Sequence, residues 1–469
     1  RTKAIALQRH SVDVARRVFG PGDAGRADAI LGFVGTLQER PERSEIPALL
    51  TEAKAALDAA GETTTFVRGA LLTETARYSK HEGLPVARET ADAAVEFFRR
   101  YHPQRASLIT NYRLAGQAWM QSRAYAQAEA QFQSAVDTAR LRGPAAPAWL
   151  VGSLSDLGEA QRAQMKLAAA ESSLREALAH SRKVNGEDHR ETLLTRLKLA
   201  NLLLATGRTT EGLALQAAMR EAIDRAPSRY DATFRQNATD LIAANALARG
   251  RPQDVAVQLA ADVELLSASF PRSNSRNASE LALAEVWIAL GRFDDARLML
   301  ADAIAHRREG LGAAADPRAW LPYRRVQAQL ERANGDPQKA LEVLAAVPAD
   351  ALGAGDVETI AIEIERADAL RLAGRSDEAT AAARRALASL QALSKPYSLP
   401  HREAAAWEAL GAAQVALGHR DDARIAYTRA MTLRRAHDAE GSLWHAQDER
   451  ALAALGKGQG TVEPRVAAR

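Results

Sequence analysis

The sequence predicts an all-α protein, a solenoid in which pairs of short antiparallel helices stack one after another. Between residues 112 and 135, small residues alternate with bulky ones at spacings of three, four and seven, so that each kind falls on one face of a helix. The pattern returns 42 residues later, where Gly158 follows Gly116 and Ala170 follows Ala128. A period of this size is typical of α-solenoids, here expected to form a right-handed superhelix of antiparallel helix pairs.

The composition agrees with closely packed helices. The chain has 469 residues, of which 47% are hydrophobic and only 5% aromatic, so alanine and leucine supply most of the interior. Because an array buries its apolar surface unit by unit, this length does not by itself set the number of domains. Nothing in the sequence indicates a β-strand.

Charge and residue usage narrow the functional classes. Lys and Arg total 62 against 58 for Asp and Glu, an excess of +4 spread over a large surface, so we expect no direct contact with nucleic acid. The absence of cysteine excludes disulfides, thiolate nucleophiles and Cys-bound zinc. No apolar run reaches the roughly 18 residues that a membrane-spanning helix needs.

The N-terminal region is expected to be helical but irregular. Residues 1–24 form a basic leading helix, either a juxtamembrane or domain-linking helix or a solvated cap on the array. Residues 25–102 form divergent helical hairpins, the best of which runs from 66 to 101 and turns at 83–85. Because the chain begins with Arg1, we expect it to be a piece of a longer protein, and the cytoplasmic and periplasmic sides of a membrane-anchored parent both stay open.

Residues 103–436 contain about eight units. The first helix of each unit carries a small residue at its centre: Gly116, Gly158, Ala200, Ala243, Ala284, Ala328, Ala367 and Gly411. From the third unit onward a glycine marks the turn between the two helices: Gly207, Gly250, Gly291, Gly335, Gly374 and Gly418. We expect each of these glycines to end its helix in the left-handed conformation. A small residue follows five positions later except at Val255, where we expect looser packing.

Helix-start residues support these boundaries. Asp316, followed by Pro317, and Asp356 are predicted N-caps. Residues 437–456 are expected to form a C-terminal capping helix. Residues 457–469 have no apolar face to bury and are expected to be a disordered tail.

The repeated pattern and its turns resemble the tetratricopeptide repeat. The turns are GRFDDA at 291–296 and GRSDEA at 374–379, and the loop at 185–208 is similar to the kinesin-light-chain-like variety of the repeat. The long array and the basic leading helix also resemble the C-terminal half of large bacterial serine/threonine kinases or DNA-binding regulators. That resemblance implies a sensory segment whose parent carries the output domain, because no kinase motif occurs in these residues.

No motif indicates catalysis, a metal or a cofactor. The ten histidines include no HExxH arrangement, and we interpret His189 as a loop-packing residue. Glycine clusters at 310–312 and 456–460 lack the strand that precedes a phosphate-binding loop. Trp287 and Trp407 fit the bulky core positions of their units. We therefore predict no enzyme activity for this segment and no cofactor.

The concave surface is the predicted binding site. In tetratricopeptide arrays the first helices line the inner surface, so the polar residues that flank each small centre are expected to form a groove for a peptide or a neighbouring domain. These residues are Arg113, Gln117, Gln121, Glu159, Arg162, Asn201, Asp240, Arg325, Gln329, Arg332, Asp368 and Arg371.

Two functional hypotheses are consistent with these residues. The first is a protein–protein interaction scaffold, or the sensory half of a larger bacterial signalling protein, that binds a peptide or a neighbouring domain in the groove. The alternative is a small-ligand sensor that controls an upstream kinase or DNA-binding output domain. Self-association through an exposed end of the array also stays open.

Overall fold

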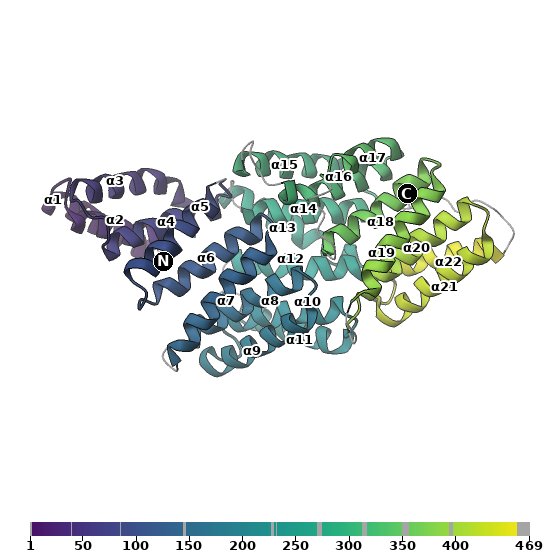
Figure 1. Cartoon of the computed structure of the whole chain (residues 1–469), viewed down its shortest axis with the longest axis horizontal. Coiled ribbons are helices and arrows are strands. Elements are labelled where there is room, and N and C mark those ends of the chain that lie inside the picture. Colours follow the sequence, from purple (N-terminus) through teal and green to yellow (C-terminus); the bar gives the residue numbers. More distant parts are fainter. Residues whose placement is uncertain are drawn as a thin grey trace. The chain divides into compact units, whose positions relative to one another are not determined.

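The computed structural model describes residues 2–38, 40–84, 86–143, 147–226, 229–230, 232–269, 274–311, 317–348, 356–393 and 397–456. Within these ranges the chain forms α-helices and short 3-10 turns and no strand (Figure 1). The helices before the array are α1 (Thr2–Val18), α2 (Ala24–Leu37), α3 (Ile46–Ala59), α4 (Phe66–His81) and α5 (Ala87–Tyr101), with a 3-10 turn at Pro41–Glu45. The all-α prediction is confirmed.

The array alternates first and second helices, as the period predicts. The first helices are α6 (Ser107–Gln121), α8 (Pro147–Ala163), α10 (Arg190–Ala205), α12 (Ala232–Ala248), α14 (Asn274–Ala289), α16 (Leu321–Ala333), α18 (Val357–Leu372) and α20 (Pro400–Ala416). The second helices are α7 (Tyr125–Leu141), α9 (Leu167–Asn185), α11 (Thr209–Arg225), α13 (Ala256–Ser269), α15 (Phe293–Leu311), α17 (Pro337–Ala345), α19 (Ser376–Gln391) and α21 (Arg420–His437). A last helix, α22 (Leu443–Gly456), follows them.

The glycines in the turns have the predicted backbone conformation. All six have positive φ, between 75° at Gly250 and 86° at Gly335. At the first of them, Arg208 N donates to Leu203 O at 2.8 Å, and Gly207 N donates to Leu204 O at 3.2 Å. This is the Schellman pattern, which satisfies carbonyls at the helix end. The glycine prediction is therefore confirmed.

In the first two units of the array, residues other than glycine occupy the left-handed position in the turn. Arg123 and Met165 have φ values of 59° and 60°, a conformation that costs free energy for a residue with a side chain. These turns therefore keep the same geometry without the residue best suited to it.

The small central residues lie against bulky side chains of the second helices. A Cβ atom added at Gly116 would lie 2.5 Å from Phe132 Cε1, and one at Gly158 would lie 2.7 Å from Leu174 Cγ. Such distances are far below van der Waals contact, so the helices approach this closely only because these positions lack a side chain. The alternation of small and bulky residues thus sets the distance between the paired helices.

The structure describes three positions that carry local predictions from the sequence. Asp356 caps α18, because its side chain accepts a hydrogen bond from Glu358 N at 2.9 Å, whereas Asp316 lies outside the described residues. His189 does more than pack in a loop: it is the N-cap of α10, and its Nδ1 accepts from Glu191 N at 3.2 Å. Val255 is buried at 4% exposure, between a 3-10 turn at Pro252–Asp254 and the start of α13, and the looser packing expected there stays a prediction.

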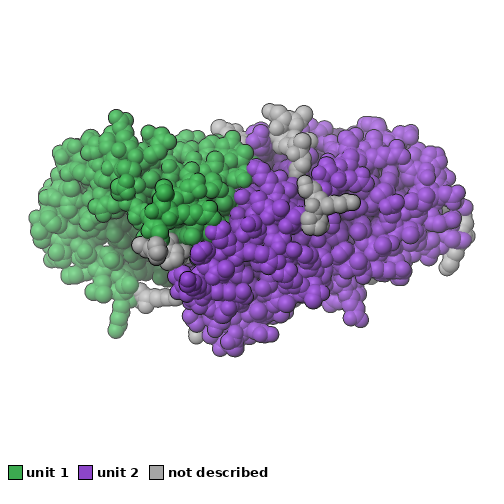
Figure 2. Space-filling model, turned by 60° about the horizontal axis from the view of Figure 1, so that its bottom comes forward, with its two compact units in different colours: residues 1–157, 265–276, 306–315 green, residues 158–264, 277–305, 316–469 purple. Residues whose placement is uncertain are grey.

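The chain divides into two compact units, which Figure 2 colours separately. Unit 1 comprises residues 1–157, 265–276 and 306–315, and unit 2 comprises residues 158–264, 277–305 and 316–469. In unit 1, Arg307 near the end of α15 donates from Nη2 to Gln121 O at 2.9 Å. The boundaries predicted at residues 24, 102, 436 and 456 stay predictions, and the tail predicted at 457–469 lies outside the described residues.

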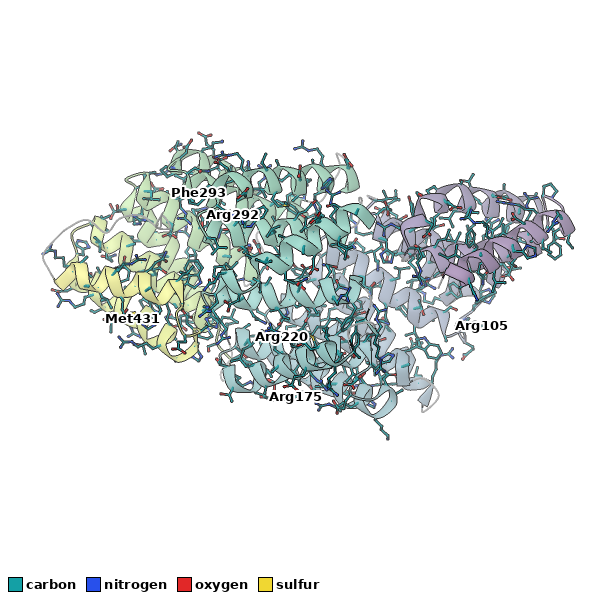
Figure 3. The ribbon with its side chains drawn as sticks, turned by 180° about the vertical axis from the view of Figure 1, so that it is seen from behind. Arg105, Arg175, Arg220, Arg292, Phe293 and Met431 are labelled. Carbon is teal, nitrogen blue, oxygen red and sulfur yellow. The ribbon has the colours of Figure 1, made fainter. Side chains whose placement is uncertain are left out.

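Unit 2 folds back on itself. One buried core cluster joins Leu174 of α9 and Leu203 of α10 to Ile364 of α18 and Ala409 of α20. At the edge of this cluster Arg175 of α9, labelled in Figure 3, forms an ion pair with Glu171 at 2.6 Å. Helices nearly half the chain apart in sequence therefore share one core, a contact between distant repeats that the repeat pattern did not predict.

Candidate ligand-binding cavity

Unit 2 contains a half-open cavity of about 440 Å³. Its walls come from the first helices α12, α14, α16, α18 and α20 and from α21 and α22. The larger apolar side chains that line it are Leu247, Ile288, Ile364 and Trp444, and alanines fill much of the remaining wall. Charged and amide side chains lie between these apolar groups.

The centre of the polar lining is Arg325, which joins three successive first helices. Its Nη1 lies 2.7 Å from Glu285 Oε1 of α14, and its Nε lies 2.6 Å from Glu358 Oε1 of α18. Burial acts to lower the pKa of Arg325, but the two carboxylates outweigh burial and raise the pKa above its ordinary value. Arg325 therefore stays charged and is held in place.

A second buried ion pair lies about two turns further along the same helices. Arg332 donates from Nη2 to Glu365 Oε2 at 3.2 Å, and the two side chains are only 7% and 3% exposed. Gln329, between the two arginines, accepts a hydrogen bond from Arg325 Nη1 at 3.3 Å. The polar side chains of α16 that line the cavity are thus bonded to neighbouring side chains.

Arg434 of α21 is also fixed by carboxylates. It donates to Asp448 Oδ2 at 2.6 Å and to Glu408 Oε2 at 2.7 Å, and all three side chains are buried. These contacts tie α22 to α20 and α21 at the edge of the cavity.

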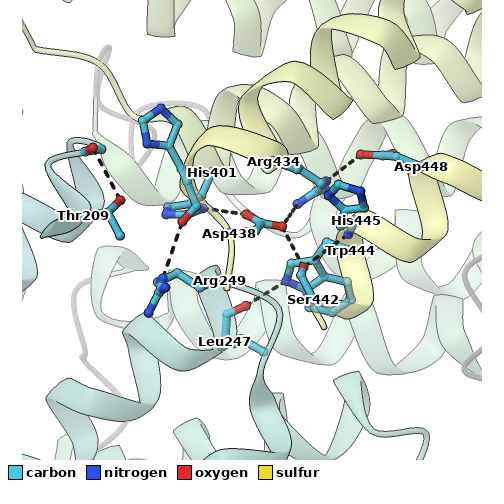
Figure 4. A network of polar contacts seen from close by, with 12 residues as sticks. Thr209, Leu247, Arg249, His401, Arg434, Asp438, Ser442, Trp444, His445 and Asp448 are labelled. Atoms are coloured by element: carbon cyan, nitrogen blue, oxygen red, sulfur yellow. Dashed lines mark hydrogen bonds and ion pairs between the residues drawn. The ribbon is translucent and has the colours of Figure 1, made fainter. Parts of the chain in front are cut away.

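The turn between α21 and α22 packs against the end of α12 and so completes the cavity wall (Figure 4). We call the contact of residues 247–251 with residues 437–444 the closing contact. In it, Leu443 N donates to Gly250 O at 3.0 Å, and Trp444 Nε1 donates to Leu247 O at 2.8 Å. Because Leu247 and Trp444 also line the cavity, the same residues hold the contact and form the wall.

Two histidines lie at the closing contact. His401 Nδ1 lies 3.0 Å from Asp438 Oδ1, and both side chains are buried. Burial, followed by the proximity of His401, lowers the pKa of His437. Burial would raise the pKa of Asp438, but His401, Arg434 and Ser442 together hold it below its usual value.

Three polar groups that line the cavity have no hydrogen-bond partner among the described residues. They are His401 Nε2, Gln447 Oε1 and the guanidinium of Arg402. The first two atoms are buried, and unpartnered buried polar atoms are costly. Burial also lowers the pKa of Arg402, on which the charges of Glu358, Arg325, Glu285 and Arg162 act from a distance.

The structure brings three of the twelve predicted groove residues into this cavity: Arg325, Gln329 and Arg332. In unit 1, Arg113 Nε and Gln117 Nε2 both donate to Asp156 Oδ2, at 3.0 and 3.1 Å. Gln121 Nε2 donates to Lys80 O at 3.2 Å. These three residues of unit 1 thus bond to neighbouring helices.

The remaining predicted residues lie on the first helices of unit 2. Arg162 pairs with Glu159 at 3.1 Å, and Asn201 accepts a hydrogen bond from Asn245. Asp240 accepts from Ser279 Oγ at 2.8 Å. Asp368 is buried at 3% exposure, and Arg371 is half-buried. Most of the twelve predicted groove residues therefore bond to other side chains of this chain.

The predicted set leaves out the acids that pair with Arg325 and Arg332 and several charged residues near the cavity. The acids Glu285, Glu358, Glu365 and Asp448 and the arginines Arg402 and Arg434 are all absent from the predicted set. A signal for one of them exists: Glu285 and its partner Arg325 lie 40 positions apart, close to one repeat. Polar residues that recur at the repeat period on first helices are therefore candidates for bonds between units.

Two features are absent from the described part of the chain. No group of three or more His, Cys, Asp or Glu side chains there could hold a metal ion. No described helix combines the length and apolar character needed to cross a membrane.

The repeated helical hairpins, their glycine ends and the polar inner wall define a tetratricopeptide-like α-solenoid. No protein-family model matches the sequence, and no curated protein matches it. The solved structures that it matches include a putative kinesin light chain with nearly identical TPR-like repeats from Podospora anserina. That match has 23% identity and a TM-score of 0.32 and covers 44% of this chain and 96% of that one.

Two further matches are longer. A Rap protein complexed with competence and sporulation factor matches with 12% identity and a TM-score of 0.49, over 88% of this chain and 98% of that one. The apo form of the quorum sensor NprR from B. thuringiensis matches with 13% identity and a TM-score of 0.42, over 77% of this chain and 97% of that one. At these identities the likeness concerns the fold alone.

Proposed function

We propose that the chain is a protein-interaction module that binds a peptide segment in the cavity of unit 2. The observation that carries this proposal is the set of unpartnered polar groups of His401, Arg402 and Gln447 in a cavity whose other charged side chains are bonded to one another. A bound peptide would supply partners for these groups, while its side chains would contact Ile288, Ile364 and the surrounding alanines. Its extended backbone offers both donors and acceptors.

The rigidity of the cavity supports binding. Arg325 and Arg332 are held by carboxylates of adjacent helices, so few side chains need to be ordered when a ligand enters. A preformed site loses less conformational entropy on binding, and more of the contact free energy appears as affinity.

The closing contact supports a sensory role for this binding. Leu247, His401 and Trp444 take part in the polar network of the closing contact and also line the cavity. A ligand in the cavity would therefore interact differently with the form in which the closing contact is made and with a form in which it is broken. A ligand shifts a conformational equilibrium by the difference of its affinities for the two forms. In the setting that we propose, a larger bacterial signalling protein, an upstream kinase or DNA-binding domain would read this shift.

Selection from a random peptide display library tests the proposal. Selected peptides are then titrated against the full chain, against Ala405→Phe, which fills the cavity, and against Ala388→Phe on the exposed side of α19. We expect Ala405→Phe to weaken binding at least about tenfold and Ala388→Phe to leave it unchanged. Peptides that bind both variants alike would contradict the proposal.

A small-ligand sensor is the second candidate. The volume of about 440 Å³ lies within the roughly 300–1,000 Å³ of typical small-molecule sites. Titration calorimetry against a metabolite collection, with Ala405→Phe as the control, discriminates the two. A saturable heat that Ala405→Phe abolishes, without any selected peptide, would favour the small ligand.

A further inference from the structure

We propose that Arg402 binds the anionic group of a ligand whose body is otherwise apolar. This inference rests on the proposed function of the cavity of unit 2 as the ligand site, and it names the chemistry of the ligand. A carboxylate on an apolar segment of peptide is the form that this chemistry takes under the proposed function.

Arg402 differs from the other arginines of the lining in its contacts. Arg325, Arg332 and Arg434 each form ion pairs with carboxylates at 2.7 Å or less. Arg402 forms neither a hydrogen bond nor an ion pair with any described residue, although it lines the same cavity. A guanidinium has five N–H donors in a planar fork that suits a carboxylate or a phosphate. Its donors are therefore available to a ligand.

The two carboxylates whose charges act on Arg402 do not compete for these donors. Glu285 and Glu358 act on Arg402 only through their charge, because both are bonded to Arg325. The two carboxylates balance the charges of Arg325 and Arg402, while Arg162 adds a further positive charge that also acts on Arg402. One added anion balances this remaining charge, so we expect a ligand with one charged group and not several.

Two further features favour an anion at this place. Arg402 and His401 lie in the first turn of α20, which runs from Pro400 to Ala416, and the start of a helix carries a partial positive charge. The surrounding wall also presents apolar side chains, among them Ile288, Ile364 and Trp444. An ionic contact is stronger in such surroundings than in water.

A pair of fluorescent probes tests the inference without knowledge of the natural ligand. 8-Anilinonaphthalene-1-sulfonate has an apolar body and one anionic group, and N-phenyl-1-naphthylamine has the same body without the charge. Both are titrated against the full chain, against Arg402→Met and against Arg384→Met, an exposed position on α19. Circular dichroism melting of each variant establishes that it is folded.

We expect Arg402→Met to weaken the sulfonate probe at least about tenfold and to leave the neutral probe within twofold, with Arg384→Met unchanged for both. If Arg402→Met does not fold, Arg402→Lys replaces it and should weaken the sulfonate probe by a smaller factor, because the charge remains and the fork is lost. Equal binding of the sulfonate by wild type and variant, or equal loss of both probes, would overturn the inference.

The library peptides separate this inference from the proposed function. Peptides that lose affinity with Ala405→Phe but not with Arg402→Met would refute the anion site and leave the function standing. Probe discrimination by Arg402 without any cavity-dependent peptide would refute the function and leave the anion site standing. Amidation of the peptide C-terminus and Glu→Gln changes within the peptide identify which carboxylate is bound.

Discussion

Tyr397 Oη donates a hydrogen bond to Glu171 Oε2 at 2.9 Å, although 226 positions separate the two residues. Glu171 lies at the start of α9, where its Oε1 also contacts Arg175 and Arg208 at 2.6 and 2.5 Å. Burial would raise the pKa of Glu171, but Arg208, Arg175 and Tyr397 together hold it below its usual value. This carboxylate connects the loop before α20 to a helix near the beginning of unit 2.

The first prediction concerns this long-range bond. Tyr397→Phe removes the hydroxyl and should lower the free energy of unfolding by about 1–2 kcal/mol, since the acceptor is charged. Thermal melting followed by circular dichroism measures the change. Tyr112→Phe is the control, because Tyr112 is half-buried and has no hydrogen bond among the described contacts. Equal effects of the two changes would contradict a stabilising role for the Tyr397–Glu171 hydrogen bond.

The second prediction concerns the glycine turns. Gly335 has φ of +86° and open space where a Cβ would lie, so Gly335→Ala should cost about 1–2 kcal/mol from backbone conformation alone. Gly32→Ala, at an exposed position within α2, should instead stabilise by about 0.5–1 kcal/mol. Chemical denaturation measures both, and effects of the same sign would contradict the left-handed assignment.

The third prediction concerns pH. Burial, with a smaller contribution from Asp262, raises the pKa of Asp240 from 3.8 to about 7. The unfolded chain gives up this proton near pH 4 and the folded chain near pH 7, so stability is lost as pH rises between these values. Asp240→Asn removes the loss and should stabilise by about 1–3 kcal/mol at pH 8 and little at pH 4.

Asp377→Asn, on the exposed side of α19, is the control for this pH series. Its effect on the melting temperature should change much less between pH 4 and pH 8 than the effect of Asp240→Asn. A gain from Asp240→Asn that is the same at pH 4 and pH 8 would show that the side chain is not held protonated by its surroundings.

The fourth prediction concerns the ion pairs of the cavity wall. Arg325→Met removes the positive charge that the carboxylates of Glu285 and Glu358 both contact and should cost about 3–5 kcal/mol. Neutralising both acids in the same protein, by Glu285→Gln and Glu358→Gln, should recover most of this loss. Urea denaturation gives the values, and failure of the triple variant to recover stability would contradict the assignment of the cost to unpaired charge.

The local features of the fold could be predicted from the sequence because their causes are local. Gly207 and its five counterparts are required where a helix ends in the left-handed conformation, and Gly116 is small because Phe132 fills the adjacent space. Arg325, Gln329 and Arg332 could be predicted as inner-wall residues from their positions in the sequence relative to Ala328 alone.

The cavity itself could not be predicted, because contacts between distant units create it. Nothing near Gly250 indicates that its carbonyl accepts from Leu443, and nothing near Arg402 indicates that it lacks a partner. The repeat period defines each unit and its neighbour, whereas small differences accumulated over many units decide whether the array returns on itself. Prediction of the closing contact therefore requires the path of the whole of unit 2.

The distance across the closing contact can be measured directly. The chain contains no cysteine, so Gln253→Cys and Glu440→Cys provide the only two sites for nitroxide labels. Arg251, two residues before one label, donates from Nη1 to the backbone carbonyl of Glu440 at 2.7 Å, and both substitutions leave this bond intact. Electron paramagnetic resonance should give strong dipolar coupling with one short, narrow distance; a broad distribution of long distances would contradict closure of unit 2 around its cavity.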